Sequence, residues 1–173
     1  MRIFSVIGHK NSGKTTLLVA LAREFKRQGR RVGTIKHATH PALVDREGTD
    51  TYRHFHEGCA EHTLIASPDL RVLFERAPDD MDPESLARRY MAQADLVLVE
   101  GFRKATIPKV EVYRKDLGVP TIYDVAGHPS DWVAILTDDT TLRSTCRVLR
   151  FQDTMWLPVL AGLVWERAME LSP

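Results

Sequence analysis

A chain of 173 residues with 43% hydrophobic and 27% charged residues has the size and composition of one globular domain, which we expect to span residues 1–173. Its formal net charge of +1 provides no overall attraction to nucleic acid or to an acidic membrane surface, so neither partner is predicted. Two distant cysteines without a CxxC pair, no signal peptide and no run of ~20 apolar residues argue against a disulfide scaffold, structural zinc or a membrane span, and favour the cytoplasm.

Short β-rich runs and helical patterns alternate along the first fifty residues. Residues 3–7 form an apolar run typical of a buried strand. Residues 15–28 follow helical periodicity, and Gly29 ends that helix. The apolar face of this helix consists of Leu17, Leu18, Leu21 and Phe25. A second strand is expected at 31–36, and the polar, irregular segment 37–50 has the length of a functional loop.

The same alternation continues to the end of the chain. Further helices are expected at 51–57, at 153–170, and after Asp82, which caps a helix with Pro83 at its first position. Further strands are expected at 62–66, 71–75, 96–99, 110–114, 121–123 and 133–136. The pattern predicts an α/β fold with a mostly parallel central sheet flanked by helices.

A phosphate-binding motif follows the first predicted strand. The sequence matches GxxxxGK[ST] at every fixed position, with the residues Gly8, His9, Lys10, Asn11, Ser12, Gly13, Lys14 and Thr15. Glycines let successive backbone N–H groups converge on a phosphate, and the dipole of the following helix adds to their field. We expect Lys14 to reach the outer phosphates, Thr15 to hold Mg²⁺, and Thr16 to donate near the α-phosphate. The motif predicts a P-loop NTPase fold that binds a purine nucleoside triphosphate with Mg²⁺.

An acidic residue ends the most apolar strand. Residues 95–101 read Asp-Leu-Val-Leu-Val-Glu-Gly, and a strand neighbouring the phosphate-binding loop delivers a carboxylate to magnesium in this way. Glu100 is therefore the predicted magnesium ligand, directly or through a water, and a catalytic candidate. Asp95 competes for the role, but it lies at the start of the strand, away from the carboxyl ends where ligands gather.

The loop after the second strand carries histidines and acids. His37 and His40 leave that strand at its carboxyl end, where contact with the phosphates or with a partner is expected. Asp45 and Asp50 follow, and either could orient the attacking water in a segment that acts as a nucleotide-dependent switch. The alternative of a transition-metal site at the two histidines lacks a third fixed ligand.

Several of these motifs occur together in one known family. The phosphate-binding loop, Ile35-Lys36-His37 with His40, the Asp45…Gly48-x-Asp50 spacing, Gly58 and Leu98-Val99-Glu100-Gly101-Phe102-Arg103 resemble the MobB family. Its members are adaptor proteins of molybdopterin-guanine dinucleotide biosynthesis, a branch of molybdenum cofactor biosynthesis. The resemblance covers about residues 1–140 and leaves the last thirty residues as a generic helix.

The resemblance implies a homodimer that binds GTP and Mg²⁺, hydrolyses GTP feebly, and assists MobA, the guanylyltransferase that attaches GMP to molybdopterin. It implies nucleotide contacts from Gly8 through Thr16, with the 37–50 loop beside the site and Glu100 opposite. Two features depart from related GTPases. His9 stands where some relatives carry an extra lysine, with Lys10 one place away. Thr137-Asp138-Asp139 is an incomplete NKxD motif, in which either aspartate could pair with the guanine N1–H and N2–H₂ edge.

Two other classes of protein remain open on the residues. A maturation GTPase that delivers nickel would need a metal site that Cys59 and the scattered histidines do not supply. A small-molecule kinase would use arginines of a lid. The candidates for that lid are Arg88, Arg89, Arg143, Arg147 and Arg150. For the dimer interface, the β character of residues 109–114, with Tyr123, predicts an edge hairpin that pairs across a two-fold axis.

Overall fold

The computed structural model describes residues 1–38, 44–77 and 81–172. The chain divides into two compact units, one formed by Met1–His37 with Asp82–Pro173 and the other by Ala38–Met81. The single domain expected for residues 1–173 stays a prediction.

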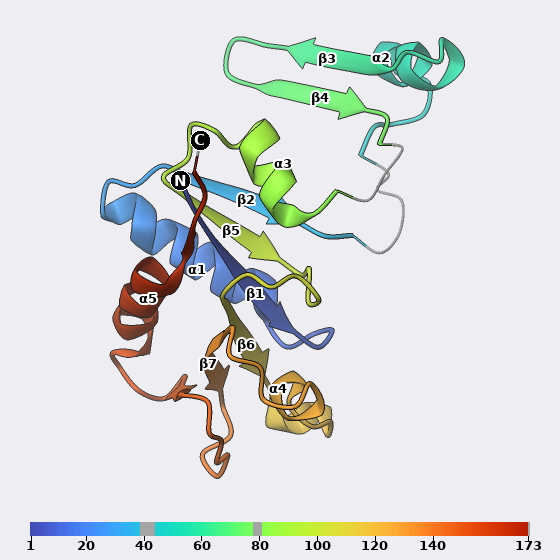
Figure 1. The fold of residues 1–173 in the computed structure, drawn as a ribbon. Helices are drawn as coiled ribbons and strands as arrows, with labels where there is room; N and C mark the ends of the chain where they lie inside the picture. Colours follow the sequence, from blue (N-terminus) through green and yellow to red (C-terminus); the bar gives the residue numbers. More distant parts are fainter. Residues whose placement is uncertain (39–43, 78–80, 173) are drawn as a thin grey trace. The chain divides into compact units, whose positions relative to one another are not determined.

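The first unit is built on one sheet, shown in Figure 1. Its strand order is β2-β5-β1-β6-β7-β8, and every neighbouring pair along this path is parallel. The strands of the path are β1 (Arg2–Gly8), β2 (Val32–Lys36), β5 (Leu96–Glu100), β6 (Lys109–Tyr113), β7 (Trp132–Thr137) and β8 (Val148–Arg150). A short β9 (Met169–Glu170) pairs antiparallel with the start of β1. The prediction of a mostly parallel sheet is confirmed.

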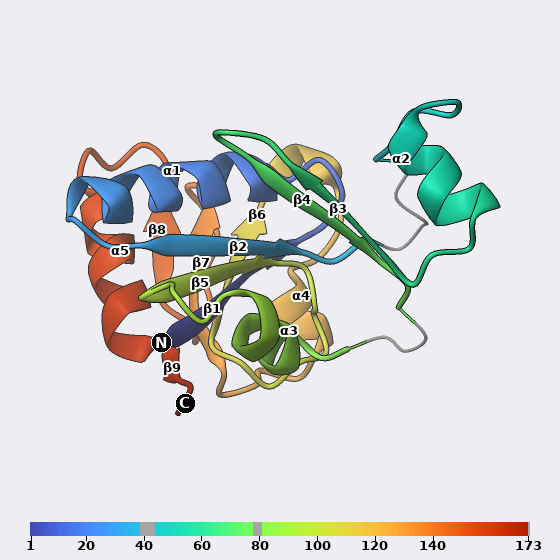
Figure 2. The ribbon, with the colours of Figure 1, turned by 90° about the horizontal axis from the view of Figure 1, so that it is seen from above.

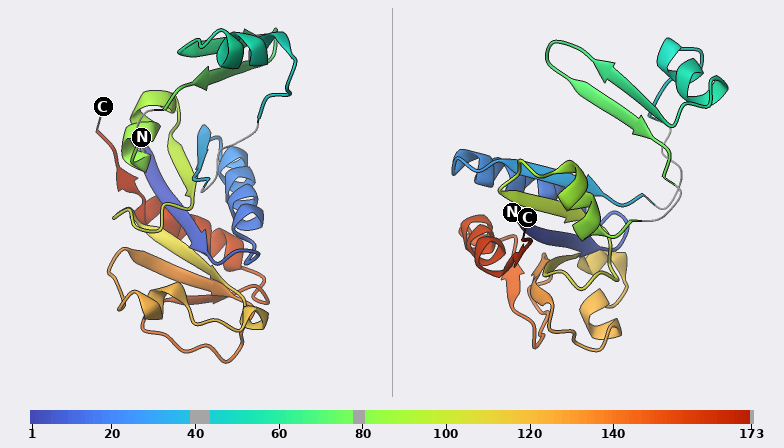
Figure 3. Two further views of the ribbon diagram at one scale, coloured as in Figure 1. Left: turned by 90° about the vertical axis from the view of Figure 1, so that its right-hand side faces the viewer. Right: turned by 45° about the horizontal axis from the view of Figure 1, so that its top comes forward.

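Helices cover both faces of this sheet (Figures 2 and 3). On one face, α1 (Lys14–Arg27) and α5 (Trp156–Arg167) pack against alternate residues of β1 such as Phe4 and Val6. On the other face, α3 (Pro83–Tyr90) packs near Ile3, and α4 (Ile122–Val125) packs near Ile7. Because both faces are covered, β5 is buried along its whole length, as its apolar sequence predicts.

The ends of α1 explain why this helix follows the phosphate-binding motif. Gly13 precedes its first residue with φ 97°, a left-handed conformation that glycine adopts without steric cost. At the other end Gly29, with φ 79°, donates to the Lys26 carbonyl while Arg30 donates to the Phe25 carbonyl. These two hydrogen bonds close the last turn of the helix. They confirm the prediction that the helix ends at Gly29.

The second unit contains a helical segment and a hairpin. The helix α2 (Asp50–Tyr52) continues into the π-helical turn η1 (Arg53–Glu57), where a helix was expected at 51–57. The strands β3 (His62–Ala66) and β4 (Arg71–Glu75) pair antiparallel, at the bounds expected from the sequence. The rings of Phe55 and Phe74 lie 6.1 Å apart and join the helical segment to the hairpin.

Two predictions about the sheet are wrong. Residues 121–123 do not form a strand, because Thr121 caps the short helix α4 by accepting from the Asp124 N–H. Residues 109–114 do not form an edge hairpin, because β6 lies inside the sheet between β1 and β7. The closing helix is also shorter than expected at 153–170, and the sequence patterns missed β8, β9 and the 3₁₀ turn η2 (Lys115–Leu117). Among the described residues, no helix is long and apolar enough to cross a membrane.

Candidate functional site

The phosphate-binding motif forms the tight connection between β1 and α1, at the carboxyl edge of the sheet. Gly8 has φ 151°, and a Cβ on it would lie 2.5 Å from both the Ser12 Oγ and the Val112 carbonyl oxygen. The loop therefore rests directly on the backbone of the neighbouring strand β6. Only a residue without a side chain allows this close approach, which is why the first glycine of the motif is needed.

Lys14 lies across this loop. Its Nζ donates to the His9 carbonyl at 2.8 Å, so the ammonium group is held over the motif that precedes it. Burial lowers the pKa of Lys14, the nearby Glu100 carboxylate opposes that shift, and the positive charge of Lys36 adds to it. The loop thus concentrates positive charge where the first N–H groups of α1, which have no partner within the helix, also point.

Ser12 is a second sign of a polar ligand at this loop. Its residue is only 1% exposed, and its Oγ has no hydrogen-bond partner among the described residues. A buried hydroxyl without a partner costs free energy, so such a group commonly marks a ligand-binding position.

Glu100 connects three elements of the site. Its Oε2 accepts from the Thr15 hydroxyl at 2.8 Å, and its Oε1 lies 3.6 Å from Lys36 Nζ. The strand register explains this arrangement, since Glu100 is paired with Val6 of β1 and with Lys36 of β2. The competing Asp95 lies at the other end of β5 and forms an ion pair with Arg31 at 2.8 Å. Hydrogen bonds from Arg31 hold the pKa of Asp95 down to about 2, so this carboxylate is already paired far from the loop.

His37 borders the same edge of the sheet. Its backbone N–H donates to the Glu100 carbonyl at 2.9 Å, and the centre of its ring lies 4.4 Å from the centre of the Phe102 ring. Gly101 has φ 98°, and a Cβ there would come within 3.0 Å of the His37 Cβ. The Gly101 carbonyl accepts from the Ser5 hydroxyl at 2.9 Å. These contacts fix the Glu100–Phe102 turn beside the end of β2. His40 lies outside the described residues.

Asp45 and Asp50 belong to the second unit. The Asp45 Oδ1 accepts from the Arg46 N–H at 2.8 Å and from the Thr49 hydroxyl at 3.0 Å. Hydrogen bonds lower the pKa of Asp45, and the bond from the Thr51 side chain has the largest effect. Asp50 is the first residue of α2, which Thr49 caps. In their own unit these groups organise a helix start, and a catalytic role for either stays a prediction.

Two arginines of the proposed kinase lid donate to backbone carbonyl groups. Arg88 donates to the Ser172 carbonyl, and Arg143 donates to the carbonyl of the adjacent Leu142. Within residues 1–38, 44–77 and 81–172, no three His, Cys, Asp or Glu side chains gather in a way that could hold a metal ion. The contacts of Arg88 and Arg143 thus give no support to a kinase lid, and the lack of such a cluster among the described residues gives none to a nickel site.

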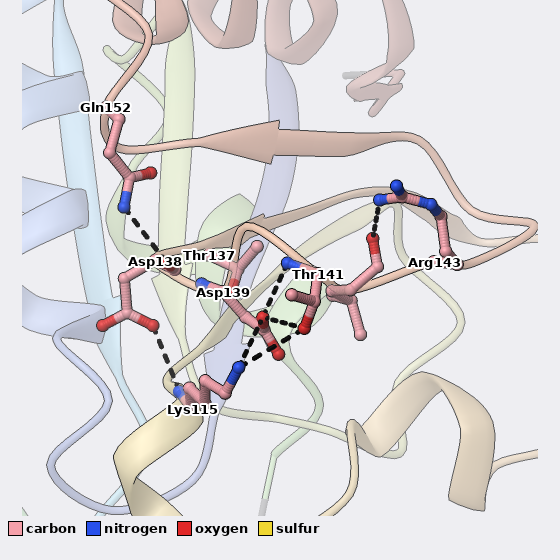
Figure 4. A network of polar contacts seen from close by, with 8 residues as sticks. Lys115, Thr137, Asp138, Asp139, Thr141, Arg143 and Gln152 are labelled. Carbon is pink, nitrogen blue, oxygen red and sulfur yellow. Dashed lines mark hydrogen bonds and ion pairs between the residues drawn. The ribbon is translucent and has the colours of Figure 1, made fainter.

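Asp138 and Asp139 follow β7 and form the polar network of Figure 4. The Asp139 Oδ1 accepts from the Thr141 N–H at 2.8 Å, from the Thr141 hydroxyl at 2.6 Å and from Lys115 Nζ at 3.3 Å. These bonds, those of Thr141 first, lower the pKa of Asp139 to about 2. The Asp138 Oδ1 accepts from the Lys115 N–H at 3.1 Å, and its carbonyl accepts from Gln152 at 3.0 Å. The side chain of Asp138 is 30% exposed, against 10% for Asp139.

Arg114 lies between this network and the phosphate-binding loop. Its Nε donates to the Ser12 carbonyl at 3.0 Å, and its Nη1 donates to the Asp138 Oδ2 at 3.1 Å. The guanidinium lies 4.0 Å from the centre of the Phe151 ring. Sequence reasoning missed Arg114, Lys115 and Lys36 as site residues. Only their position in the sequence could have indicated a site role, because each lies at or just after the carboxyl end of a strand in the sheet.

Comparison with known proteins gives a consistent result. The family model described as "Molybdopterin guanine dinucleotide synthesis protein B" matches residues 3–138. A molybdopterin-guanine dinucleotide biosynthesis adapter protein of Haemophilus influenzae is 34% identical over 119 residues, which is 68% of this chain and 66% of that protein. The chain thus spans slightly less than two thirds of this relative, and 52% of a putative adapter protein of Methanocaldococcus jannaschii with 35% identity.

Solved structures show the same fold. The crystal structure of a MobB protein homolog from Bacillus stearothermophilus has a TM-score of 0.71 and 27% identity, and it covers 96% of this chain and 100% of that one. The structure of Bacillus subtilis MobB has a TM-score of 0.72 and 26% identity, with 99% and 100% of the two chains covered. The mostly parallel sheet and the separate hairpin therefore belong to a fold already seen in crystals.

Proposed function

The chain belongs to the MobB family, and from this we propose that it is a GTP-binding adaptor with weak GTPase activity in molybdopterin-guanine dinucleotide biosynthesis. In this proposal it assists MobA, the guanylyltransferase that attaches GMP to molybdopterin. The proposal rests on family membership for the pathway and on the geometry of the phosphate-binding loop for the nucleotide. A cytoplasmic location is part of the proposal.

The observation that carries nucleotide binding is the 2.8 Å contact between the Thr15 hydroxyl and Glu100. It brings the last residue of GxxxxGK[ST] together with the acid at the end of the neighbouring strand. Lys14 and the Ser12 hydroxyl, which has no hydrogen-bond partner in the described part of the chain, lie on the same loop. A triphosphate would meet backbone N–H groups, a lysine and a hydroxyl there, which is the donor set that polyphosphates need.

Two oxygen groups at the same site also suit Mg²⁺. The Thr15 hydroxyl and the Glu100 carboxylate are oxygen ligands, the type that Mg²⁺ prefers, and Mg²⁺ keeps waters and phosphate oxygens as its other ligands. Bound there, the ion would neutralise charge on the β- and γ-phosphates. Thr15 and Glu100 would hold it, while Lys36 balances the charge of the carboxylate from the neighbouring strand.

Slow hydrolysis fits the environment of Glu100. Its two oxygens face a hydroxyl and an ammonium group, so the carboxylate is suited to holding a metal more than to taking a proton from water. Asp45 and Asp50 stay candidates for orienting water. We place the chain between a hydrolase and an adaptor, closer to the adaptor.

Guanine recognition is assigned to the segment after β7. Guanine offers two donors, N1–H and N2–H₂, which a carboxylate matches with two acceptors. One oxygen of Asp139 accepts from three donors and its side chain is 10% exposed, whereas each oxygen of Asp138 accepts from one donor and its side chain is 30% exposed. Asp138 is therefore the proposed base contact, with Asp139 holding the turn that carries it.

The hairpin of the second unit is the proposed dimer surface. Leu64 and Leu73 are paired across β3 and β4, and their residues are 61% and 47% exposed. A two-stranded hairpin with an exposed apolar pair and unpaired edges is a common site for association with a second copy of the same chain. A homodimer formed there would cover both leucines.

Two measurements test the proposed function. Titration with GTP and ATP, each with and without Mg²⁺, should show Mg²⁺-dependent binding that prefers GTP. Purified chain should also bind the guanylyltransferase and raise its output of guanylated cofactor. Equal affinity for the two nucleotides would remove the guanine assignment, and absence of both association and stimulation would remove the adaptor role.

A further inference from the structure

Arg114 touches both halves of the proposed nucleotide site. Its guanidinium bonds to the Ser12 carbonyl of the phosphate-binding loop and to the Asp138 carboxylate of the base-binding segment. The two contacted residues lie 102 and 24 positions away from Arg114 in the sequence.

The geometry leaves this guanidinium little freedom. It lies 4.0 Å from the centre of the Phe151 ring, and Phe151 is fixed in turn by its N–H bond to the Thr137 carbonyl at 3.0 Å. A planar guanidinium has donors in a rigid fork, so holding one contact sets the direction of the other. Only 30% of the side chain is exposed, which limits exchange of either bond with water.

The consequence for Asp138 is a defined orientation. Its Oδ1 faces the Lys115 N–H and its Oδ2 faces Arg114, so both oxygens are held from the β6 side. Burial raises the pKa of this carboxyl, but the bonds from Lys115 and Arg114 prevail and leave it lowered. An oriented, ionised carboxylate retains a second lone pair on each oxygen for the two donors of guanine.

We propose that Arg114 is a positioning residue that couples the phosphate-binding loop to base recognition by Asp138. Resting on the proposed binding of GTP, this inference makes the discrimination of guanine depend on a side chain that touches neither base nor phosphate. Contact of guanine with Asp138 would stabilise the hydrogen bond from Arg114 to the Ser12 carbonyl. A phosphate-binding loop in its binding conformation would in turn hold Asp138 in place through Arg114.

Inosine triphosphate is the probe for this coupling, because it lacks only the 2-amino group that Asp138 would accept from. The loss of one charge-assisted hydrogen bond lowers binding affinity roughly 10- to 100-fold. The wild-type chain should therefore bind GTP at least about 10-fold more tightly than inosine triphosphate. Arg114→Met should reduce this ratio to below about 3. Asp138→Ala should do the same, and the double variant should show no further reduction in the ratio.

Arg143→Met is the matched control, because Arg143 lies between β7 and β8 and donates to the adjacent Leu142 carbonyl rather than to Ser12 or Asp138. It should keep the wild-type ratio. Should Arg114→Met fail to fold, Arg114→Lys decides, because one ammonium cannot reproduce the rigid fork; the ratio should then fall at least about threefold.

Four outcomes separate the possibilities. A lower ratio in the Arg114 variants with a wild-type ratio in Arg143→Met supports the coupling. Equal weakening of GTP and inosine triphosphate, with the ratio preserved, overturns it while leaving nucleotide binding intact. Wild-type chain that binds GTP and inosine triphosphate equally also overturns it, through the base assignment, and wild-type chain that binds neither removes the proposed function itself.

Discussion

The Thr15 hydroxyl donates to the Glu100 carboxylate across 2.8 Å, although 85 positions of sequence separate the two residues. The bond exists because β1 and β5 are parallel neighbours with Val6 opposite Glu100, so the loop after one strand meets the end of the other. A nearby cation, Lys36, faces the second oxygen of the carboxylate. This small cluster is the centre of the proposed magnesium and triphosphate site.

Replacing Lys14 with alanine should weaken GTP binding by about 100-fold or more, because charge-assisted bonds to the outer phosphates are lost. Isothermal titration of GTP with Mg²⁺ measures the change. Lys26→Ala, in the last turn of the same helix α1, removes an equal charge and should leave affinity unchanged. Unaltered binding by Lys14→Ala would mean that phosphates do not bind at this loop.

Replacing Glu100 with glutamine should make GTP binding nearly insensitive to Mg²⁺, with the metal's apparent affinity falling roughly 10- to 100-fold. The measurement is GTP affinity at a series of Mg²⁺ concentrations. Asp95→Asn removes a carboxylate at the other end of β5 and should keep the full Mg²⁺ dependence. A magnesium response that follows Asp95 would relocate the metal site.

Replacing Gly8 with alanine should destabilise the fold by about 2 kcal/mol or more, because the new Cβ meets the Val112 carbonyl at a backbone conformation that alanine rarely adopts. Urea unfolding measures this difference in free energy. Gly162→Ala in α5, where a Cβ meets nothing within 4 Å, should instead stabilise by about 0.5–1 kcal/mol. Equal effects of the two variants would contradict the close approach of loop and strand.

Acid should remove the contribution of Asp139 to stability. The pKa of this carboxyl is lowered to about 2 in the folded chain, against an ordinary value of about 4 when unfolded. Because the folded pKa is the lower one, the contribution is present above about pH 4 and is lost as the pH falls toward 2. Urea midpoints of wild type and Asp139→Asn should differ at pH 6 and converge between pH 4 and 2. Curves that stay parallel would exclude this linkage.

Replacing both Leu64 and Leu73 with lysine should convert a dimer to a monomer, because the exposed apolar pair is lost and the lysines of one copy would repel those of a second copy. Sedimentation velocity measures the state of association. The affinity for GTP should stay at the wild-type value, since the phosphate-binding loop belongs to the other unit. A double variant that sediments as wild type would place the interface elsewhere.

Local sequence signals predicted the parts of the fold that depend on nearby residues. The Asp82 cap with Pro83 at the first helical position appears as expected, with Asp82 accepting from Glu84 and Ser85. The strand–loop–helix unit around Gly8 and Lys14 also forms as predicted, because turn glycines and amphipathic periodicity are properties of short segments.

Contacts between distant segments escaped the same reasoning. The β-branched and aromatic residues at 121–123 favour a strand, but the buried Glu111 carboxylate accepts from the Ile122 and Tyr123 N–H groups and holds a helix start instead. Burial raises the pKa of Glu111, yet nothing in its own segment indicates that partnership. Arg114 is similar, because its bond to Ser12 depends on the order of strands in the sheet.

The close approach of Gly8 to β6 has a consequence for the order in which the protein is assembled. During synthesis the entire GxxxxGK[ST] motif emerges first, but the carbonyl of Val112 against which Gly8 rests is made about a hundred residues later. A nascent chain that ends before β6 therefore carries every residue of the motif but lacks the strand on which Gly8 rests. If the loop binds a triphosphate as proposed, capture of that ligand would report that β6 has paired with β1 in the middle of the sheet.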